Sequence, residues 1–310
     1  MFCKVNRLRA CVCLILAAAL HATAVAQARE AAMGHSGDLK TYVTGCKSIA
    51  YQEYGTAKPI VLLAGGPGMN PAYMVPVAKM LASGGRRVLL VHQRGTGMSA
   101  EAISCRDRMN LAGAIADLET LRQHLHLEKL TIAGHSWGGM LAMAYAQKYP
   151  NRVAGLLLLD TGPMDRSAFP AEEAAVRARL TPAERTALQG AKNGAQMETI
   201  ERNAFFADVG NAKRLPESIP PGEPLWYESA EDLIAPDLNS FDVIPGMRTL
   251  SAPVTLVFGR FDPGFFIARR IREVQPKTRL IVVEHAGHYV WLEDPAKAAA
   301  ILKAAATELP

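Results

Sequence analysis

Residues 130–138, Leu-Thr-Ile-Ala-Gly-His-Ser-Trp-Gly, decide the fold of this chain. The first four residues form a short apolar run, and helical spacing begins at Trp137 and continues to residue 148. Between them stands a G-x-S-x-G pattern, in which two glycines leave room for a strained turn that lifts the serine above the edge of a parallel sheet. We therefore predict that Ser136 is a nucleophile; an ordinary turn serine is the alternative.

The flanking sequence alternates strands and helices. Apolar runs predict buried strands at residues 59–64, 87–91, 130–133, 153–159, 253–258 and 280–283. Helical spacing predicts helices around residues 74–82, 110–126, 137–148 and 295–307. Ahead of them, β-formers interrupted by Thr44-Gly45 indicate a hairpin over residues 41–54. Continuous apolar strands separated by helices are typical of a parallel sheet covered on both faces.

Length and composition place the chain among folded globular proteins. It has 310 residues, 49% hydrophobic and 20% charged, which is enough to bury a large core without a metal or a disulfide lattice. The formal charge of +5 includes Lys4, Arg7 and Arg9; without them 31 basic residues stand against 29 acidic ones. The densest basic groups are the pairs Arg86-Arg87 and Arg269-Arg270, so we expect no nucleic-acid partner.

Residues 1–28 have the pattern of a cleavable export signal. A basic start precedes an apolar run over residues 10–20, and small residues with Ala-x-Ala spacing end the segment. The run is shorter than the roughly 20 residues that cross a bilayer, which disfavours a membrane anchor. Two cysteines lie near the start of the run and not at its end, which disfavours lipid attachment. We expect cleavage near Ala26 or Ala28, no stable membrane insertion afterwards, and a periplasmic or secreted protein.

A serine nucleophile needs a histidine to take its proton and a carboxylate to orient that histidine. When a G-x-S-x-G turn carries the serine, the acid and then the histidine follow it in the chain. His288, just beyond the last predicted strand, is our candidate base, and His285 beside that strand is the alternative. Asp262, which follows the strand at residues 253–258, is our candidate acid, and Asp160 at the end of the preceding strand is its rival.

Acyl transfer also requires two backbone N–H groups that stabilise the oxyanion. The turn after the serine presents the amide of Trp137. Residues 65–68, Gly-Gly-Pro-Gly, end an earlier strand and can bring a second amide close, for which Gly66 is our candidate. A glycine-rich turn without function is the alternative.

Other chemistries have weaker support. Residues 95–100 fit the G-x-G-x-x-A pattern of dinucleotide-binding folds, but residues 101–107 do not begin an apolar-faced helix. No glycine loop is followed by Lys-Ser or Lys-Thr, so there is no P-loop. Neither H-E-x-x-H nor a paired C-x-x-C occurs, and we expect no metal and no cofactor.

Three motifs together make the sequence resemble the α/β-hydrolase superfamily and, within it, the proline iminopeptidase-like serine aminopeptidases. That group has His-Gly-Gly-Pro-Gly, Asp-Gln-Arg-Gly-x-Gly-x-Ser and Gly-x-Ser-Trp-Gly. Residues 64–68, 92–99 and 134–138 match them, and the resemblance runs from about residue 42 to residue 302 apart from an inserted segment. Two positions depart: Ala64 replaces the histidine of the first motif and His92 the aspartate of the second.

The resemblance implies an α/β-hydrolase fold with a mostly parallel sheet of eight-strand type and helices on both faces. Residues 29–163 and 251–310 would form this core, and residues 164–250 a helical cap. It further implies a serine hydrolase that forms an acyl-enzyme on a small-molecule or short peptide substrate, as an aminopeptidase does. A carboxylesterase for small esters is the alternative, and a non-catalytic ligand-binding protein that kept the fold is a third possibility.

An aminopeptidase has to bind a cationic α-amino group, which carboxylates in the cap would do. Glu201 and Glu228 are our candidates, with Trp226 placed to pack a pyrrolidine ring. The alternative is that both acids are solvated charges on helix faces.

Cys46 and Cys105 are the two cysteines that remain after signal cleavage. In an oxidising compartment they form either a disulfide or two buried thiols. If the sheet has the order that the resemblance implies, the second hairpin strand lies antiparallel beside the strand that ends at Val91, and both cysteines share one edge. We therefore predict a disulfide between them.

Overall fold

The computed structural model describes residues 37–310, so the predicted export signal at residues 1–28 lies outside the described residues. Residues 37–219 and 224–310 form one compact unit that contains the sheet and its helices.

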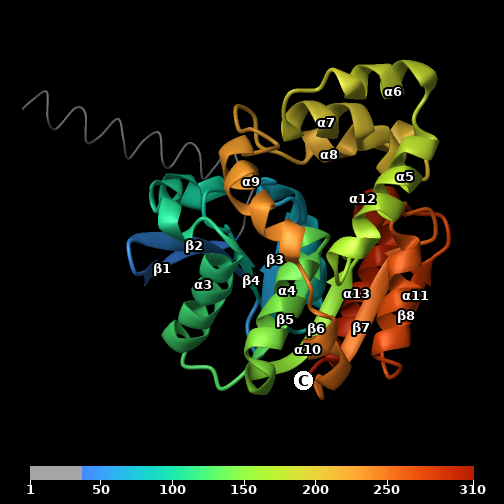
Figure 1. The fold of residues 1–310 in the computed structure, drawn as a ribbon. Helices are drawn as coiled ribbons and strands as arrows, with labels where there is room; N and C mark the ends of the chain where they lie inside the picture. The colour runs from blue at the N-terminus through green and yellow to red at the C-terminus, as the bar shows by residue number, and fades with distance from the viewer. Residues whose placement is uncertain (1–36) are drawn as a thin grey trace, which may run out of the picture. The chain divides into compact units, whose positions relative to one another are not determined.

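An eight-stranded sheet runs through this unit in the order β1-β2-β4-β3-β5-β6-β7-β8 (Figure 1). β1 and β2 form the predicted hairpin, β2 is antiparallel to β4, and the remaining neighbours are parallel. The mostly parallel eight-stranded sheet is thereby confirmed. The strands are β1 (Asp38–Thr44), β2 (Lys47–Tyr54), β3 (Pro59–Leu63), β4 (Arg87–Val91), β5 (Leu130–His135), β6 (Val153–Leu159), β7 (Val254–Gly259) and β8 (Arg279–Val283).

Successive side chains of each strand enter two different hydrophobic layers, as the pleat of a strand requires. In β3, Val61 and Leu63 pack with α3 (Leu111–His124), α4 (Trp137–Lys148) and α11 (Phe265–Val274). Ile60 and Leu62 pack instead with α2 (Val75–Ser83), α12 (Val290–Glu293) and α13 (Pro295–Glu308). Because both faces are covered, the strands appear in the sequence as continuous apolar runs.

Between β6 and β7 the chain is helical, with α5 (Phe169–Arg179), α6 (Pro182–Gln189), α7 (Gly194–Glu201), α8 (Arg214–Glu217), α9 (Glu228–Ile234) and α10 (Ile244–Thr249). Helices α5, α6 and α7 gather beyond one end of the strands (Figure 1). The last helix of the expected cap behaves differently: α10 packs on α4 and α11, and Met247 is buried in their layer. The insertion therefore rejoins the core before residue 250, because α10 supplies apolar cover for α4.

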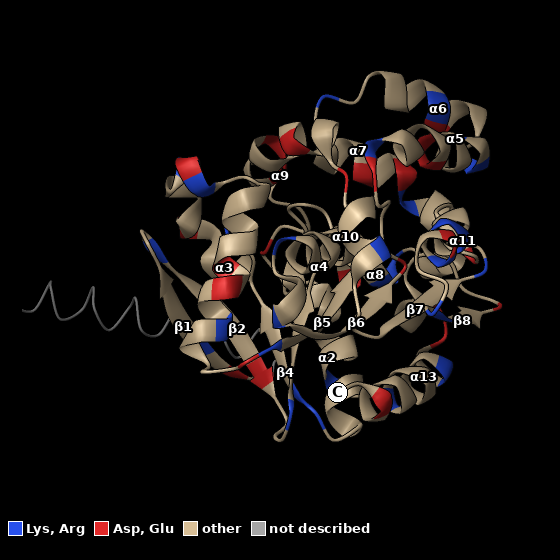
Figure 2. Ribbon diagram, turned by 60° about the horizontal axis from the view of Figure 1, so that its bottom comes forward, with Lys and Arg blue, Asp and Glu red and all other residues tan. Residues whose placement is uncertain are grey.

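Charged side chains are dispersed over this fold. Lys, Arg, Asp and Glu are spread over many of the helices and loops (Figure 2). Of the helices within residues 37–310, none combines the length and the apolar character that a membrane span requires.

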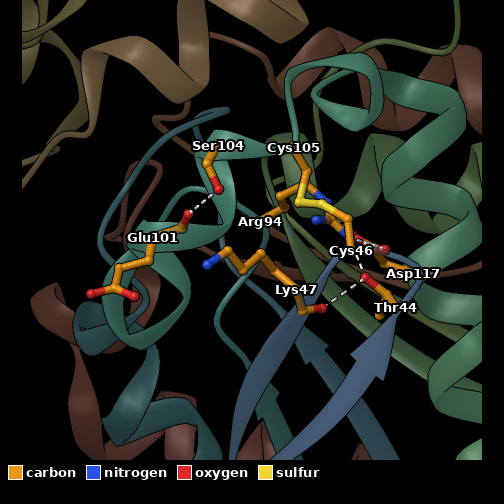
Figure 3. Close-up of a disulfide and its surroundings, with 8 residues drawn as sticks. All are labelled: Thr44, Cys46, Lys47, Arg94, Glu101, Ser104, Cys105 and Asp117. Atoms are coloured by element: carbon orange, nitrogen blue, oxygen red, sulfur yellow. Dashed lines mark hydrogen bonds and ion pairs between the residues drawn. A yellow bond between two sulfur atoms is a disulfide. The ribbon is translucent and has the colours of Figure 1, made fainter.

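A disulfide joins Cys46, in the turn of the β1–β2 hairpin, to Cys105, which follows the 3₁₀ segment Gly97–Ser104 (Figure 3). The two Cα atoms are 6.4 Å apart. Beside the disulfide, Arg94 makes paired bonds of 2.6 and 2.9 Å to Asp117 and also donates to the hydroxyl of Thr44. The edge hairpin is thus attached to the loop that carries the second sequence motif.

Replacing both Cys46 and Cys105 by Ser should lower the free energy of unfolding by about 4 kcal/mol, because the bond closes a loop of 59 residues and so restricts the unfolded chain. Chemical unfolding of the oxidised protein and the double variant measures the difference. Alkylation followed by mass spectrometry is the control, because it shows whether the two thiols of the native protein are free. Two free thiols, or equal stability of the two proteins, would contradict this prediction.

Candidate active site

Ser136 lies at the tip of the turn between β5 and α4, with φ +53° and ψ −120°. L-residues other than glycine seldom adopt a positive φ, so the surrounding structure has to hold this backbone. Its amide donates to the carbonyl of Leu159 (3.1 Å), and its carbonyl accepts from the amide of Gly139 (2.9 Å). At Gly138 a side chain would collide with the carbonyls at the end of β3. The strained turn predicted from G-x-S-x-G is the one that the backbone forms.

His288 and Asp262 come together at the ends of β8 and β7. His288 Nδ1 lies 2.9 Å from Asp262 Oδ2, and both side chains are buried. Asp262 Oδ1 accepts a hydrogen bond of 2.7 Å from the amide of Gly264, which fixes the carboxylate. Of the alternatives, His285 is exposed, and Asp160, which is buried beside Asp262, accepts the amide of Gly259 at 2.7 Å.

The two predicted oxyanion donors line one cavity with Ser136 and His288. Trp137 is the first residue of α4, and the first amides of a helix have no acceptor within it. Gly66 has φ +114°, and a Cβ there would collide with the next turn of its own loop. This arrangement suits a carbonyl oxygen that gains negative charge.

Gln93 connects the two segments that carry these amides. Its Nε2 donates to the carbonyl of Ala64 (2.8 Å), and its Oε1 accepts from Trp137 Nε1 (3.0 Å). The residue belongs to a motif quoted from the sequence, but sequence reasoning assigned it no role.

His135, the variable residue of G-x-S-x-G, is fully buried and joins three loops. The amide of Gly65 donates to the hydroxyl of Tyr73 (2.6 Å), and that hydroxyl lies 2.7 Å from His135 Nδ1. His135 Nε2 lies 3.0 Å from the carbonyl of His288. Since a carbonyl can only accept, Nε2 carries the proton and Nδ1 accepts from the hydroxyl of Tyr73. Every donor and acceptor in this series of hydrogen bonds then has a partner. Burial lowers the pKa of His135 well below its ordinary value, so the ring is neutral.

The two departures from the motif pattern have structural explanations. His92 Nδ1 accepts the amide of Met98 (3.0 Å), the kind of bond to a loop amide that an aspartate carboxylate would also accept. Its Nε2 lies 3.3 Å from Gln52 Oε1. Ala64 is buried in the apolar layer that contains Tyr73.

The cavity has a volume of about 230 Å³, and the cap contributes much of its wall. Trp226 lines it, as predicted, but Glu201 and Glu228 do not. Burial raises the pKa of Glu201, and the charges of Arg177 and Glu173 of α5 act on it to a smaller extent. Glu228 lines a separate hollow among α6 and α7. The acids that line the cavity are Glu172 of α5 and Glu198 of α7. Sequence reasoning missed them because helix periodicity does not say which face of a cap helix is turned toward the site.

These two acids have different surroundings. Glu198 is paired with Arg202 by two bonds of 2.6 and 2.7 Å. For Glu172, burial and then the negative charge of Asp262 raise the pKa to about 7. An anionic Glu172 is therefore costly in the empty site, and a bound cation would favour it.

The cap is bonded directly to the histidine loop. The amide of His288 donates to the carbonyl of Phe205 (2.7 Å). Glu293 accepts the amides of Ala207 (2.8 Å) and Asp208 (3.0 Å) with one oxygen and the amide of Gly287 (2.5 Å) with the other. The position of the cap and the position of His288 are therefore coupled.

The segment after Gly95 is a 3₁₀ helix, Gly97–Ser104, and not the packed α-helix of a dinucleotide-binding fold. Within the described part of the chain, His, Cys, Asp and Glu form no group of three that could hold a metal ion.

Tyr73→Phe should lower the free energy of unfolding by about 1–3 kcal/mol, because it leaves the amide of Gly65 and Nδ1 of His135 buried without a partner. Tyr149→Phe is the matched control, since that side chain is only partly buried and its ring contact with Tyr145 survives. Urea unfolding of both variants checks this. Equal stability of the two variants would show that the bonds around His135 do not hold these loops.

Residues 58–295 match the family model described as alpha/beta hydrolase fold. A proline iminopeptidase of Saccharolobus solfataricus is 26% identical over 270 residues, which cover 82% of this chain and 86% of the relative. A proline iminopeptidase of Clostridium botulinum is 41% identical over 110 residues, 35% of this chain and 37% of the relative. Some relatives are thus matched over only about a third of their length and others over most of it.

Solved structures agree on the fold. A proline iminopeptidase-related protein of Thermus thermophilus superposes with a TM-score of 0.72 at 20% identity, over 89% of this chain and 99% of that one. An esterase of Exiguobacterium antarcticum superposes with a TM-score of 0.67 at 19% identity, over 87% of this chain and 99% of that one. Since the family model spans most of the sequence and the sheet has the expected order, the chain belongs to the α/β hydrolase fold family and is a hydrolase similar to the proline iminopeptidases.

Proposed function

We propose that this hydrolase works through a catalytic triad of Ser136, His288 and Asp262. Ser136 attacks the substrate carbonyl, and His288, held by Asp262, takes the serine proton. His288 then gives this proton to the amine or alcohol that leaves as the acyl-enzyme forms. The amides of Gly66 and Trp137 stabilise the oxyanion, and water then releases the acyl group. The observation that carries this proposal is the placement of Ser136, on a strained turn, in one cavity with a histidine whose Nδ1 is bound to a buried aspartate.

We further propose that the substrate is a short peptide or amide with a free N-terminus. Relatives that are named proline iminopeptidases support this reading. So does Glu172, which lines the cavity and has no ion pair among the described residues, so that it is available to a cationic amine. Aromatic rings of Trp226 and Phe205 would pack the first residue of the peptide.

An esterase is the second candidate, and a specific feature favours it. Phe169, Leu238 and Met140 add apolar wall to the cavity, which suits the acyl or alcohol part of a small ester. One of the similar folds is an esterase by name. The proposed triad serves both reactions. Whether the protein is an aminopeptidase or an esterase therefore depends on whether it prefers substrates with a free amine.

We also propose that the mature chain is exported. The basic start, the apolar run and the Ala-x-Ala ending of residues 1–28 support this. The disulfide supports it too, because such bonds persist in oxidising compartments. Thiol alkylation of the protein from separated cell fractions tests export together with the disulfide: an oxidised protein outside the cytoplasm supports the proposal, and a reduced cytoplasmic one opposes it.

Ser136→Ala should reduce kcat by about a million-fold, close to the loss of the whole triad, since members of a triad act as a unit. Hydrolysis of an activated ester and of aminoacyl amides measures the loss. Ser167→Ala, a change in the 3₁₀ turn before α5, is the control and should keep full activity. If Ser136→Ala retained substantial turnover, the assignment of the nucleophile would be wrong. Absence of turnover in the unmutated protein on every ester and amide would favour the non-catalytic binding protein.

Glu172→Gln should reduce kcat/KM for free-amine substrates by about tenfold and leave N-acetylated substrates unchanged, because only the former carry the cation that the carboxylate attracts. The pKa of Glu172 is about 7, so the carboxylate is present above that pH and lost below it. The preference of the unmutated enzyme for free amines should therefore decrease as the pH falls through about 7, and the Glu172→Gln variant should show no such decrease.

Glu201→Gln and Glu228→Gln are matched controls for that experiment, because both acids lie outside the cavity. A loss of amine preference in these controls and not in Glu172→Gln would contradict the assignment. Equal activity of the unmutated enzyme on free-amine and N-acetylated substrates would support the esterase.

A further inference from the structure

Asp160 is a buried carboxyl group that the proposed mechanism does not use. It directly follows β6, has a relative exposure of 0%, and lies in contact with the side chain of Asp262, which is 3% exposed. Its backbone takes an unusual positive φ of +40°, and its amide donates to the carbonyl of Val257 at 2.8 Å. The position of its side chain is therefore set by the ends of two strands.

The two oxygens of Asp160 have different surroundings. Oδ1 accepts the amide of Gly259 at 2.7 Å, but no donor within the described residues reaches the buried Oδ2. Asp262 already accepts from Gly264 with one oxygen and from His288 with the other. Two ionised carboxylates cannot bond to each other, whereas one proton on Oδ2 of Asp160 would satisfy that oxygen and add a donor to Asp262.

The charges around the pair favour retention of that proton. Burial, then the negative charge of Asp262 and further that of Glu293, raise the pKa of Asp160 well above its ordinary range. His288 is bonded to Asp262, and Glu172 and Arg179 of the cap interact electrostatically with Asp262. Because His288 pairs with Asp262 and not with Asp160, Asp262 is the member that carries the negative charge.

We propose that Asp160 is a positioning residue that keeps its proton at neutral pH and donates it in an O–H hydrogen bond to the Asp262 carboxylate. Asp262 then receives three donors, from Gly264, His288 and Asp160, which leave it one orientation toward the histidine. The positioning role rests on the proposed triad; the protonation of Asp160 does not.

Infrared difference spectroscopy tests the proton directly. At a pH near 7.5 the spectrum of the unmutated protein minus that of Asp160→Asn should show the carbonyl stretch of one protonated carboxyl; the band of partly protonated Glu172 is common to both proteins and cancels. Asp107→Asn is the matched control, because that carboxyl is exposed, and the band should remain. A spectrum without a difference between the unmutated protein and Asp160→Asn would overturn the proposal, whether or not the protein proves to be a serine hydrolase.

Stability against pH gives a second readout of the same proton. In the unfolded chain Asp160 ionises near pH 4, whereas the folded chain keeps its proton, so this group makes the fold less stable as the pH rises above 4. Asp160→Asn cannot ionise, and its Tm relative to the unmutated protein should therefore rise between about pH 5 and pH 8. A constant difference over that range would contradict the proposal.

The kcat of two variants shows whether Asp160 positions Asp262 or is only a buried residue. Asn at position 160 still donates to Asp262 and accepts from Gly259, so Asp160→Asn should keep kcat within about threefold. Asp160→Val cannot donate, and its kcat should fall by about tenfold with KM unchanged. Full kcat in a folded Asp160→Val would overturn the positioning role; if that variant does not fold, a large loss of kcat in Asp160→Asn would overturn it equally.

Discussion

The site depends on one set of buried hydrogen bonds centred on His135. The proton on its Nε2 goes to the carbonyl of His288, and its Nδ1 receives the hydroxyl of Tyr73, which in turn accepts the amide of Gly65. These bonds unite the glycine-rich loop, the strained turn and the histidine loop, which come from three distant parts of the sequence. Only a neutral ring with this tautomer satisfies all of them, and burial keeps the ring neutral. Strain at Ser136 persists because the loops around it are bonded to one another.

Much of the fold follows from the sequence because both faces of the sheet are covered. Buried parallel strands appear as unbroken apolar runs, so the strand at residues 87–91 and the helix at residues 137–148 have the predicted bounds. The same geometry brings Asp262 and His288 to one edge, since parallel strands end together. Chain order and strand ends favoured Asp262 over Asp160 and His288 over His285, and the structure places the two favoured side chains 2.9 Å apart.

The cap residues that line the cavity could not be predicted from the sequence in this way. Its helices are short and mixed in polarity, and which face looks into the cavity depends on how the insertion packs, which local periodicity does not encode. We chose Glu201 and Glu228 because aromatic residues stand near them in the sequence, but the acids that line the cavity are Glu172 and Glu198. The connecting roles of Gln93 and His135 were also out of reach, because each depends on a partner more than 25 residues away in the chain.

The strained turn, the histidine loop and the cavity meet at Ser136, which we propose is a nucleophile activated by His288. Peptide mapping of the protein after reaction with a fluorophosphonate tests it most directly. We expect one phosphonylated residue, Ser136, and an adduct that forms far more slowly when His288 is replaced by Ala, because the serine then has no group to take its proton. A native protein that gives no adduct, or one whose adduct maps to another serine, would contradict the claim.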